Sequence, residues 1–332
     1  MTDLLSVARL AGVSRATAAR AFSEPEKVRP ATREKIFFAS QQLGFRPNYV
    51  ARQLRTQSTC MIGVMVPTLS NPLFSEQLQG MENVARAAGY SLVIATTDYD
   101  SERELAVLEN MLRQRVDGLV LTVANALNSP CLALLKRESL PVVLVHNPSA
   151  PAHFITVSVD NHRAMYQATH HLLALGHTRI GMLAGPMRQS DRALLRYQGY
   201  RQAMIDSNHL PLPLIEMPHH TQVEAEPLRH YFDTDGELTA LLCSNDLLAL
   251  SAIGALTRLG YHVPDDISVV GFDGIALGEM VSPSLCSVVQ PTHELGLVAI
   301  QSLLKLIGGD NVASRELDFI MRPGESIAQA QH

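Results

Sequence analysis

Short, continuous runs of apolar residues recur along most of this chain and alternate with segments of helical periodicity. The run Met61–Val66 precedes a helical segment at Glu76–Ala88, and Leu92–Ala95 precedes another at Glu102–Arg115. A strand that is apolar on both faces must be covered on both faces, so this alternation predicts parallel sheets flanked by helices. Further runs lie at Gly118–Leu121, Val142–Val145, Ile180–Leu183, Leu241–Cys243 and Ile267–Phe272. These are too many strands for one compact sheet, and we therefore expect two α/β lobes, with ligands at the carboxyl ends of their strands.

The first 54 residues have a different pattern, that of a helix-turn-helix. Val7, Ala8 and Ala11 form an apolar stripe, Gly12 permits a tight turn, and the Ser14 hydroxyl can cap a second helix. A third helix is predicted at residues 32–43. Three helices within about 45 residues make a minimal core, as small DNA-binding domains do.

The second helix of this motif carries the residue types that read DNA. Its Ala18 and Ala21 can pack inward with Thr17, whereas Arg15, Ala16 and Arg20 would face outward. An exposed arginine in the first turn of a helix can make paired hydrogen bonds to guanine in the major groove. The alternative is that Arg15 and Arg20 are simply solvated helix charges.

The charge of the chain is divided unevenly. Residues 1–58 contain ten Lys and Arg and four acids, a net charge of +6, whereas the remainder contains 17 basic and 28 acidic residues, a net charge of −11, which together give the overall −5. A basic segment attached to an acidic body is typical of a nucleic-acid-binding domain linked to a domain with another task.

Several other classes of protein fit the sequence poorly. No apolar run is long enough for a signal peptide or a membrane span, so we expect a cytoplasmic protein without membrane contact. The four cysteines form no CxxC pair, and the neighbouring His170-His171 and His219-His220 lack metal-ligand spacing, so no metal and no cofactor are expected. Because GxGxxG, GxxxxGK[ST], GxSxG and HExxH are all absent, the sequence does not predict an enzyme.

Six motifs follow one another along the chain: VARLAGVSRATAARAF at 7–22, FRPNYVARQL at 45–54, RVDGLVL at 115–121, LGHTRIGMLAGP at 175–186, SNDLLALSAIGAL at 244–256 and VPDDISVVGFDG at 263–274. In this order they resemble the lactose- and galactose-repressor family of transcription regulators. VPTLSNPLF at Val66–Phe74 and FIMRPGESI at Phe319–Ile327 are most similar to the gluconate-repressor branch of this family.

The resemblance implies an N-terminal three-helix helix-turn-helix domain with a hinge helix and a two-lobed, periplasmic-binding-protein-like core of doubly wound parallel sheets. The DNA-binding domain would span residues 1–58, with the hinge helix at 47–55, and the effector-binding and dimerisation core would span 59–332. The first lobe would comprise 60–160 and 291–320, and the second 161–290 and 321–332. The family acts as homodimers or higher homo-oligomers.

The resemblance also assigns the DNA contacts. Arg15 and Ala16 match the positions that select operator bases, with Thr17 and Arg20 beside them, while Ser14 and Asn48 would hold phosphates. Leu54 matches the leucine that the family wedges into the minor groove, although the same leucine can pack against the partner's hinge helix. Arg52 would contribute to binding without regard to DNA sequence. Ala18-Ala19 replace the usual valine-serine, which removes one hydroxyl that contacts a phosphate.

Candidate effector residues lie in the core. Leu73 and Phe74 match family positions that pack on the effector, and Arg196 matches the family's effector arginine. Arg192, which matches only in the gluconate-like branch, would share a helix face with Arg196, and two arginines suit an anionic or polyhydroxylated ligand. Polar candidates at strand ends are Asn245, Asp246 and Asp273, together with the weaker candidates His146 and Asp160.

Each of these residues also has a simpler interpretation. Arg192 and Arg196 could pair with acids such as Asp191, Asn245 and Asp246 could be only a helix cap, and Phe74 could belong to the core.

The sequence as a whole predicts a transcription regulator that binds operator double-stranded DNA, and we expect it to be a repressor. A small effector would control its affinity for DNA, with a sugar acid or sugar phosphate favoured over a neutral sugar. The alternative is a solute-binding protein that has the same core fold and no regulatory role.

Overall fold

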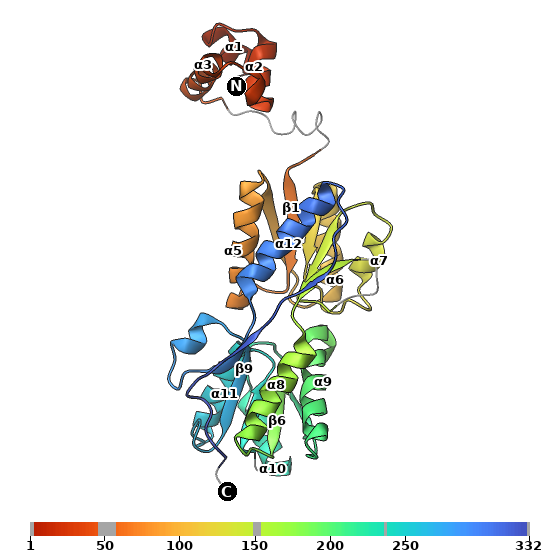
Figure 1. Cartoon of the computed structure of the whole chain (residues 1–332), viewed down its shortest axis with the longest axis vertical. Helices are drawn as coiled ribbons and strands as arrows, with labels where there is room; N and C mark the ends of the chain where they lie inside the picture. The colour runs from red at the N-terminus through yellow and green to blue at the C-terminus, as the bar shows by residue number, and fades with distance from the viewer. Residues whose placement is uncertain (1–2, 46–57, 149–153, 236–237, 331–332) are drawn as a thin grey trace. The chain divides into compact units, whose positions relative to one another are not determined.

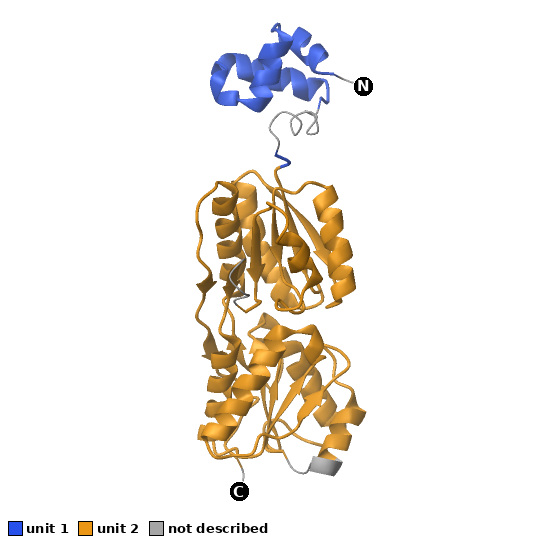
Figure 2. Ribbon diagram, turned by 90° about the vertical axis from the view of Figure 1, so that its right-hand side faces the viewer, with its two compact units in different colours: residues 1–59 blue, residues 60–332 orange. Residues whose placement is uncertain are grey.

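The computed structural model describes residues 3–45, 58–148, 154–235 and 238–330. It divides the chain into two compact units, Met1–Thr59 and Cys60–His332 (Figure 2). The hinge helix predicted at 47–55 lies outside the described residues.

The first unit is a small helical domain. Its Asp3 caps the first helix by accepting a hydrogen bond from Ser6 N at 2.8 Å, and Gly12, with φ +68°, makes the turn into the second. The interior consists of small and branched side chains, with Val7, Ala18 and Ile36 fully buried. The elements are α1 (Leu4–Leu10), α2 (Arg15–Ser23), the short 3-10 helix η1 (Pro25–Lys27) and α3 (Pro30–Gln42).

The second unit consists of two α/β lobes, each built on a six-stranded sheet (Figure 1). The first sheet has the order β11-β5-β4-β3-β1-β2 and the second β12-β10-β9-β8-β6-β7. Lobe 1 contains β1 (Met61–Val66), α5 (Pro72–Ala87), β2 (Ser91–Thr96), α6 (Ser101–Arg113), β3 (Gly118–Leu121), α7 (Pro130–Leu135), β4 (Val142–Val145), β5 (Ile155–Ser158), α12 (Thr292–Ile307) and β11 (Arg315–Glu316). Lobe 2 contains α8 (Asn161–Ala174), β6 (Ile180–Ala184), η2 (Met187–Gln189), α9 (Asp191–Asp206), β7 (Leu214–Glu216), α10 (Ala225–Asp235), β8 (Ala240–Cys243), α11 (Asp246–Arg258), β9 (Ser268–Asp273), η3 (Ala276–Glu279), β10 (Cys286–Val289) and β12 (Ile320–Arg322).

The predicted α/β class with parallel sheets is confirmed, with one difference. The strand pairs of lobe 1 run parallel, but β12 pairs antiparallel with β10 at the edge of the second sheet. The reason is that the chain leaves lobe 2 for lobe 1 at the end of β10, whereas β12 begins where the chain comes back from lobe 1 after β11. The chain passes between the lobes after β5, after β10 and after β11, so that three segments connect them.

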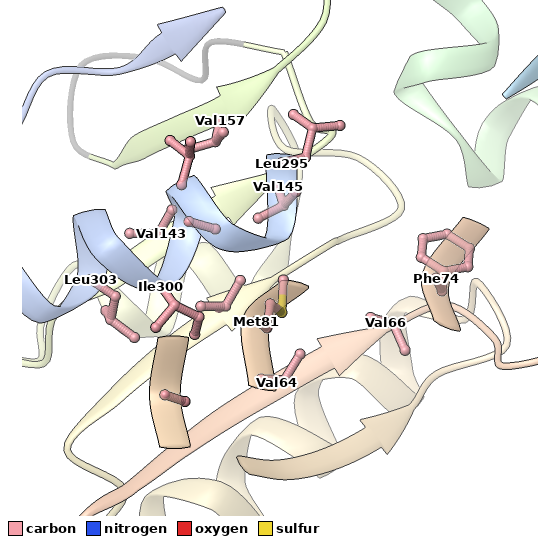
Figure 3. Packing of buried hydrophobic residues seen from close by; sticks show 14 of the residues in the cluster. Val64, Val66, Phe74, Met81, Val143, Val145, Val157, Leu295, Ile300 and Leu303 are labelled. Carbon is pink, nitrogen blue, oxygen red and sulfur yellow. The ribbon is translucent and has the colours of Figure 1, made fainter. Parts of the chain in front are cut away.

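One of the two buried clusters of lobe 1 lies where α5 and α12 cover one face of the sheet, and the other lies with α6 and α7. Val64, Val143 and Val157 of the sheet pack with Met81 of α5 and Ile300 of α12 (Figure 3).

The two helices α5 and α12 touch through their backbones. A Cβ on Gly80 would lie 2.1 Å from His293 O, and a Cβ on Gly296 would lie 2.1 Å from Gln77 O. Real Cβ atoms never approach a carbonyl oxygen this closely, so only glycine at both positions permits the crossing. The crossing fixes the position of α5, whose first turn holds Leu73 and Phe74.

Candidate DNA-reading helix and effector pocket

Helix α2 presents the residues predicted to read DNA. Ser14 caps the helix by accepting a hydrogen bond from Thr17 N at 3.1 Å, and its hydroxyl lies 2.9 Å from Thr17 Oγ1. Ala18 and Ala21 are buried, whereas Arg15, Ala16 and Arg20 are exposed and Thr17 is half-buried. The exposed face therefore carries the arginines, as a groove-reading helix requires. The predicted contacts Asn48, Arg52 and Leu54 lie outside the described residues.

A pocket lies between the lobes of the second unit, at the carboxyl edges of both sheets. Of the nine candidate effector residues, the structure brings together all but Asp246 and the weaker candidate Asp160. Lobe 1 contributes Asn71, Leu73, Phe74, Tyr99 and His146, and lobe 2 contributes Ser190, Arg192, Ala193, Arg196, His220, Ser244, Asn245 and Asp273.

Arg192 and Arg196 lie one turn apart on α9, and both side chains are 7% exposed. Arg192 Nη1 donates to Val123 O at 2.8 Å and lies 3.1 Å from Asp191 Oδ1, while its Nη2 is buried without a protein partner. This free N–H group beside the pocket can serve a ligand oxygen.

Arg196 is held from several sides. Its Nε donates to Asn161 Oδ1 at 2.8 Å, its Nη1 donates to Ser244 O, and its Cζ lies 3.6 Å from the centre of the Phe272 ring. Burial lowers the pKa of Arg196 to about 10, so the guanidinium remains charged at neutral pH. Its position is fixed before any ligand arrives, which reduces the entropy lost on binding.

Asp273 accepts hydrogen bonds from lobe 1 and from a connecting segment, and it forms an ion pair within lobe 2. Asn71 Nδ2 of lobe 1 donates to its Oδ2 at 3.2 Å, and Gln290 Nε2, just after β10, donates to its Oδ1 at 2.9 Å. Arg196 Nη1 lies 3.6 Å from Oδ1. Burial raises the pKa of Asp273, which the neighbouring Arg196 and these hydrogen bonds oppose.

Asp191 joins the lobes beside the pocket. Its Oδ2 accepts from Ala126 N and from Asn147 Nδ2, both at 2.9 Å, and its own backbone N donates to Ala124 O at 2.9 Å. Since Asp191 also pairs with Arg192, the prediction that Arg192 has an acidic partner describes this structure correctly. The pairing does not use all of the guanidinium, because Nη2 stays free.

The two histidines of the pocket are uncharged at neutral pH. Burial, with Arg192 and Arg196 nearby, lowers the pKa of His146 to about 3, and its Nε2 lies 3.1 Å from Gln77 Oε1. Burial and the charge of Arg192 lower the pKa of His220 to about 4. The His220 ring stacks on Tyr99 of the other lobe with centroids 3.8 Å apart.

Asp246, unlike the other main candidates, does not line the pocket. Its side chain is fully buried, and its carboxylate accepts hydrogen bonds from Ser287 Oγ at 2.5 Å and Ile275 N at 2.8 Å. Burial raises its pKa to about 7. Asn245 does line the pocket, but its Oδ1 caps α11 through Leu248 N at 2.9 Å, so its cap interpretation is also correct. The weaker candidate Asp160 caps α8 through Arg163 N at 2.9 Å and does not line the pocket.

Six pocket residues are not predicted from the sequence, namely Asn71, Tyr99, Ser190, Ala193, His220 and Ser244. Asn71 and Ser190 are helix caps, accepting from Leu73 N and Ala193 N, and cap signals before Pro72 and Asp191 could have identified them. Tyr99 and His220 follow strands β2 and β7 in loops without periodicity, so no pattern marks them.

Among the described residues, no three His, Cys, Asp or Glu side chains gather as they would around a metal ion. In the same part of the chain, no helix has the length and apolar character needed to cross a membrane.

Comparison with known proteins agrees with this architecture. Residues 3–48 match the family model for bacterial regulatory proteins of the lacI family, and residues 169–327 match a periplasmic binding protein-like domain. The HTH-type transcriptional regulator GntR of Escherichia coli K12 is 35% identical, with 98% of each chain covered. Catabolite control protein A of Priestia megaterium is 32% identical, with 94% of each covered.

Solved structures give the same result. A Lac repressor dimer bound to operator and the anti-inducer ONPF has a TM-score of 0.88 at 27% identity, covering 98% of this chain and 99% of the other. The transcription regulator GntR from Chromobacterium violaceum has a TM-score of 0.73 at 31% identity, covering 80% of this chain and 98% of the other. The relatives are transcription regulators rather than enzymes, and this chain belongs to the lacI family of bacterial transcription regulators.

Proposed function

We propose that this protein binds operator DNA as a homodimer or higher homo-oligomer and that a small sugar acid controls its affinity for that DNA. Residues 1–58 would be the DNA-binding domain, and 59–332 would bind the effector and form the oligomer. Its target is chromosomal DNA, so we expect the protein in the cytoplasm.

The exposed face of α2 supports the DNA-binding part of the proposal. Arg15 and Arg20 are exposed there, Ser14 and Thr17 lie in the first turn, and residues 1–58 carry a net charge of +6. The Lac repressor dimer, whose structure is similar to that of this chain, is bound to operator. Arg15 and Ala16 would contact bases, with Thr17 and Arg20 beside them, while Ser14, Asn48 and Arg52 would contact the backbone and Leu54 the minor groove.

The charge balance of the pocket is the observation that carries the choice of effector. Two buried arginines face two buried carboxylates, because Arg192 pairs with Asp191 and Arg196 lies 3.6 Å from Asp273. Both pocket histidines are neutral at pH 7, so these groups have no net charge. A phosphate of charge near −2 would leave about twice the buried excess of negative charge that a single carboxylate leaves, and such an excess is costly.

A sugar acid fits this arrangement better than a phosphate or a neutral sugar. Its single carboxylate can accept from the free Arg192 Nη2, while its hydroxyls can bond with Asp273, Asn71 and Asn245. Leu73 and Phe74 would pack on its carbon chain, and His146 offers a neutral polar group beside them.

Control of DNA binding would work through the lobes. A ligand that contacts both lobes favours one relative arrangement of them, which the oligomer passes on to the hinge and the DNA-binding domains. The coupling is reciprocal, so an effector that weakens DNA binding must itself bind less tightly to the DNA-bound protein.

A thermal-shift panel tests the effector class. We expect D-gluconate and related sugar acids to stabilise the full chain, by about 2.7 kcal/mol at 100 times the dissociation constant, while glucose 6-phosphate and glucose do not. Arg192→Gln should abolish the shift, and Arg201→Gln, an exposed arginine on the same helix α9, should leave it intact. A shift with phosphates or neutral sugars alone would refute the sugar-acid assignment.

Two measurements test the regulatory role. A target sequence is first selected from random duplexes, and the affinity of the protein for it is then measured with and without D-gluconate. We expect sequence-specific binding that changes at least about fivefold with the effector, the usual lower range of allosteric coupling. Effector binding without any DNA binding would favour the alternative of a solute-binding protein.

A further inference from the structure

The turn after β9 holds Asp273 in an unusual backbone conformation. Asp273 has φ +115° and is followed by Gly274 with φ +76°. For a residue with a side chain such a φ is unfavourable, and it persists only where the surroundings hold it in place. Contacts with neighbouring residues must therefore hold the turn at residues 273–275.

Side chains from three different elements bind the backbone of this turn. Gly274 N donates to Ser287 Oγ of β10 at 3.3 Å, and Ile275 N donates to Asp246 Oδ2 of α11 at 2.8 Å. Arg322 of β12 donates to Gly274 O and Ile275 O, both at 3.3 Å. Both N–H groups and both carbonyls of residues 274 and 275 thus have a side-chain partner. Ser287 Oγ also donates to Asp246 Oδ1, which links two of these partners.

Two glycines make room for the two charged groups. A Cβ on Gly271, within β9, would lie 2.1 Å from Asp246 Oδ1, and a Cβ on Gly278 would lie 2.6 Å from Arg322 Nη2. Alanine at either position would displace the carboxylate or the guanidinium from the turn. The neighbouring backbone is therefore shaped around Asp246 and Arg322.

Neither side chain lines the pocket. Asp246 is fully buried, and Arg322 is 14% exposed with its Nη1 also 2.8 Å from Glu279 Oε1. A buried carboxylate contributes little to the stability of the fold, because the free-energy cost of its desolvation opposes the favourable energy of its hydrogen bonds and ion pairs. Its contacts instead converge on the turn that carries a pocket residue.

We propose that Asp246 and Arg322 are positioning residues, which hold the turn at residues 273–275 from two sides and so fix the direction in which the Asp273 carboxylate meets the effector. This assignment rests on the proposed function of the pocket. It gives Asp246 a role through Asp273 in place of the direct contact expected from the sequence. Side chains that orient a ligand-binding group often matter nearly as much as the group itself.

Hydrogen–deuterium exchange of the full chain without ligand tests the hold on the turn. In Asp246→Ala and Arg322→Met, the peptide that covers the turn should exchange at least about tenfold faster than in the wild type. Ser326→Ala is the matched control, since Ser326 is fully buried in the same lobe and its Oγ binds Val269 O at 2.6 Å and Cys286 N at 2.9 Å, away from the turn. Equal exchange of the turn in all three variants would overturn the proposal.

Calorimetric titration with D-gluconate tests the consequence for binding. Asp246→Ala and Arg322→Met should weaken binding about tenfold or more, as loss of orienting hydrogen bonds does elsewhere. Asp246→Asn should stay within about threefold of the wild type, since its amide can still accept from Ile275 N and contact Ser287. Ser326→Ala should bind normally even if it is less stable, which separates positioning from general destabilisation.

Two titration results would overturn the proposal. One is normal affinity in Asp246→Ala together with a faster-exchanging turn, and the other is an Asp246→Asn defect as large as that of alanine. If the wild type binds no D-gluconate, the proposed effector class fails, and the ligand-free exchange comparison alone then decides whether Asp246 and Arg322 hold the turn.

Discussion

The close crossing of α5 and α12 predicts that replacing glycine by alanine destabilises the protein at Gly296, whereas the same replacement at Gly254 stabilises it. In Gly296→Ala, the new Cβ would lie 2.1 Å from Gln77 O, 3.0 Å from Gln77 C and 3.1 Å from Met81 N. These atoms belong to backbone and cannot rotate away, so the helices must separate by about 1 Å to reach an ordinary contact distance. Overpacking of this kind costs about 1–3 kcal/mol, and the rigid neighbours place the expected loss at the upper end.

Gly254→Ala is the matched control. Gly254 also lies inside a helix, α11, but the nearest atom to its new Cβ would be Arg258 Nη1 at 3.5 Å, an ordinary contact. Alanine there removes backbone freedom from the unfolded chain and should stabilise the protein by about 0.4–1 kcal/mol.

Urea denaturation of both variants, followed by circular dichroism, measures the two free energies of unfolding. The separation of the helices at Gln77 should also disturb His146, which binds Gln77 Oε1, and so weaken effector binding. The reasoning fails if Gly296→Ala is as stable as the wild type, or if both alanines shift stability in the same direction.

Three further outcomes are expected. Arg15→Ala should change the preference among operator sequences by about 1–3 kcal/mol, whereas Arg52→Ala should weaken all sequences alike; equal losses across a randomised operator library would remove the distinction. The DNA affinity of the wild type should fall steeply with salt, measured by fluorescence anisotropy, and an affinity independent of salt would contradict phosphate contacts by the basic domain. His146→Gln should lose part of the pH dependence of the free energy of unfolding. The pKa of about 3 in the folded protein lies below the ordinary 6.5, so the wild type gains stability relative to the variant as pH rises from about 3 to 6.5, by at most about 1.4 kcal/mol per pH unit. Parallel pH profiles of the two proteins would contradict a buried neutral histidine.

The apolar runs of the sequence predict most of the interior strands and the edge strand β2, but they miss the edge strands β7, β11 and β12 and the interior strands β5 and β10. β1 and β4 are buried along nearly their whole lengths, and such strands need continuous apolar runs, which are visible in the sequence. β7 has only three residues and β11 consists of Arg315 and Glu316, both exposed, so neither has a pattern to detect. Edge strands form because a neighbour offers hydrogen bonds, and their own side chains contribute little to that choice.

The pocket residues likewise divide into those that the sequence predicts and those that it does not. Arg192 and Arg196 could be found because they share a helix face, and Asp273 because it ends an apolar strand. The position of a residue at a strand end identifies the edge of the sheet that it occupies, but not the direction of its side chain. For this reason the sequence predicts a contact between Asp246 and the effector. Its carboxylate turns toward Ile275 N, and only the fold places residues 246 and 275 together.

The three connecting segments determine how freely the lobes can rearrange. A joint made of one strand would let two bodies tilt and twist in any direction, and much of a ligand's binding energy would be spent in selecting one orientation among many. Three connections between the same two lobes exclude many of these directions and so restrict the path along which the lobes can rearrange. Along such a path a ligand needs only a modest preference for one end to redistribute the whole population, which makes the three segments as important to the sensitivity of the protein as the residues that touch the ligand.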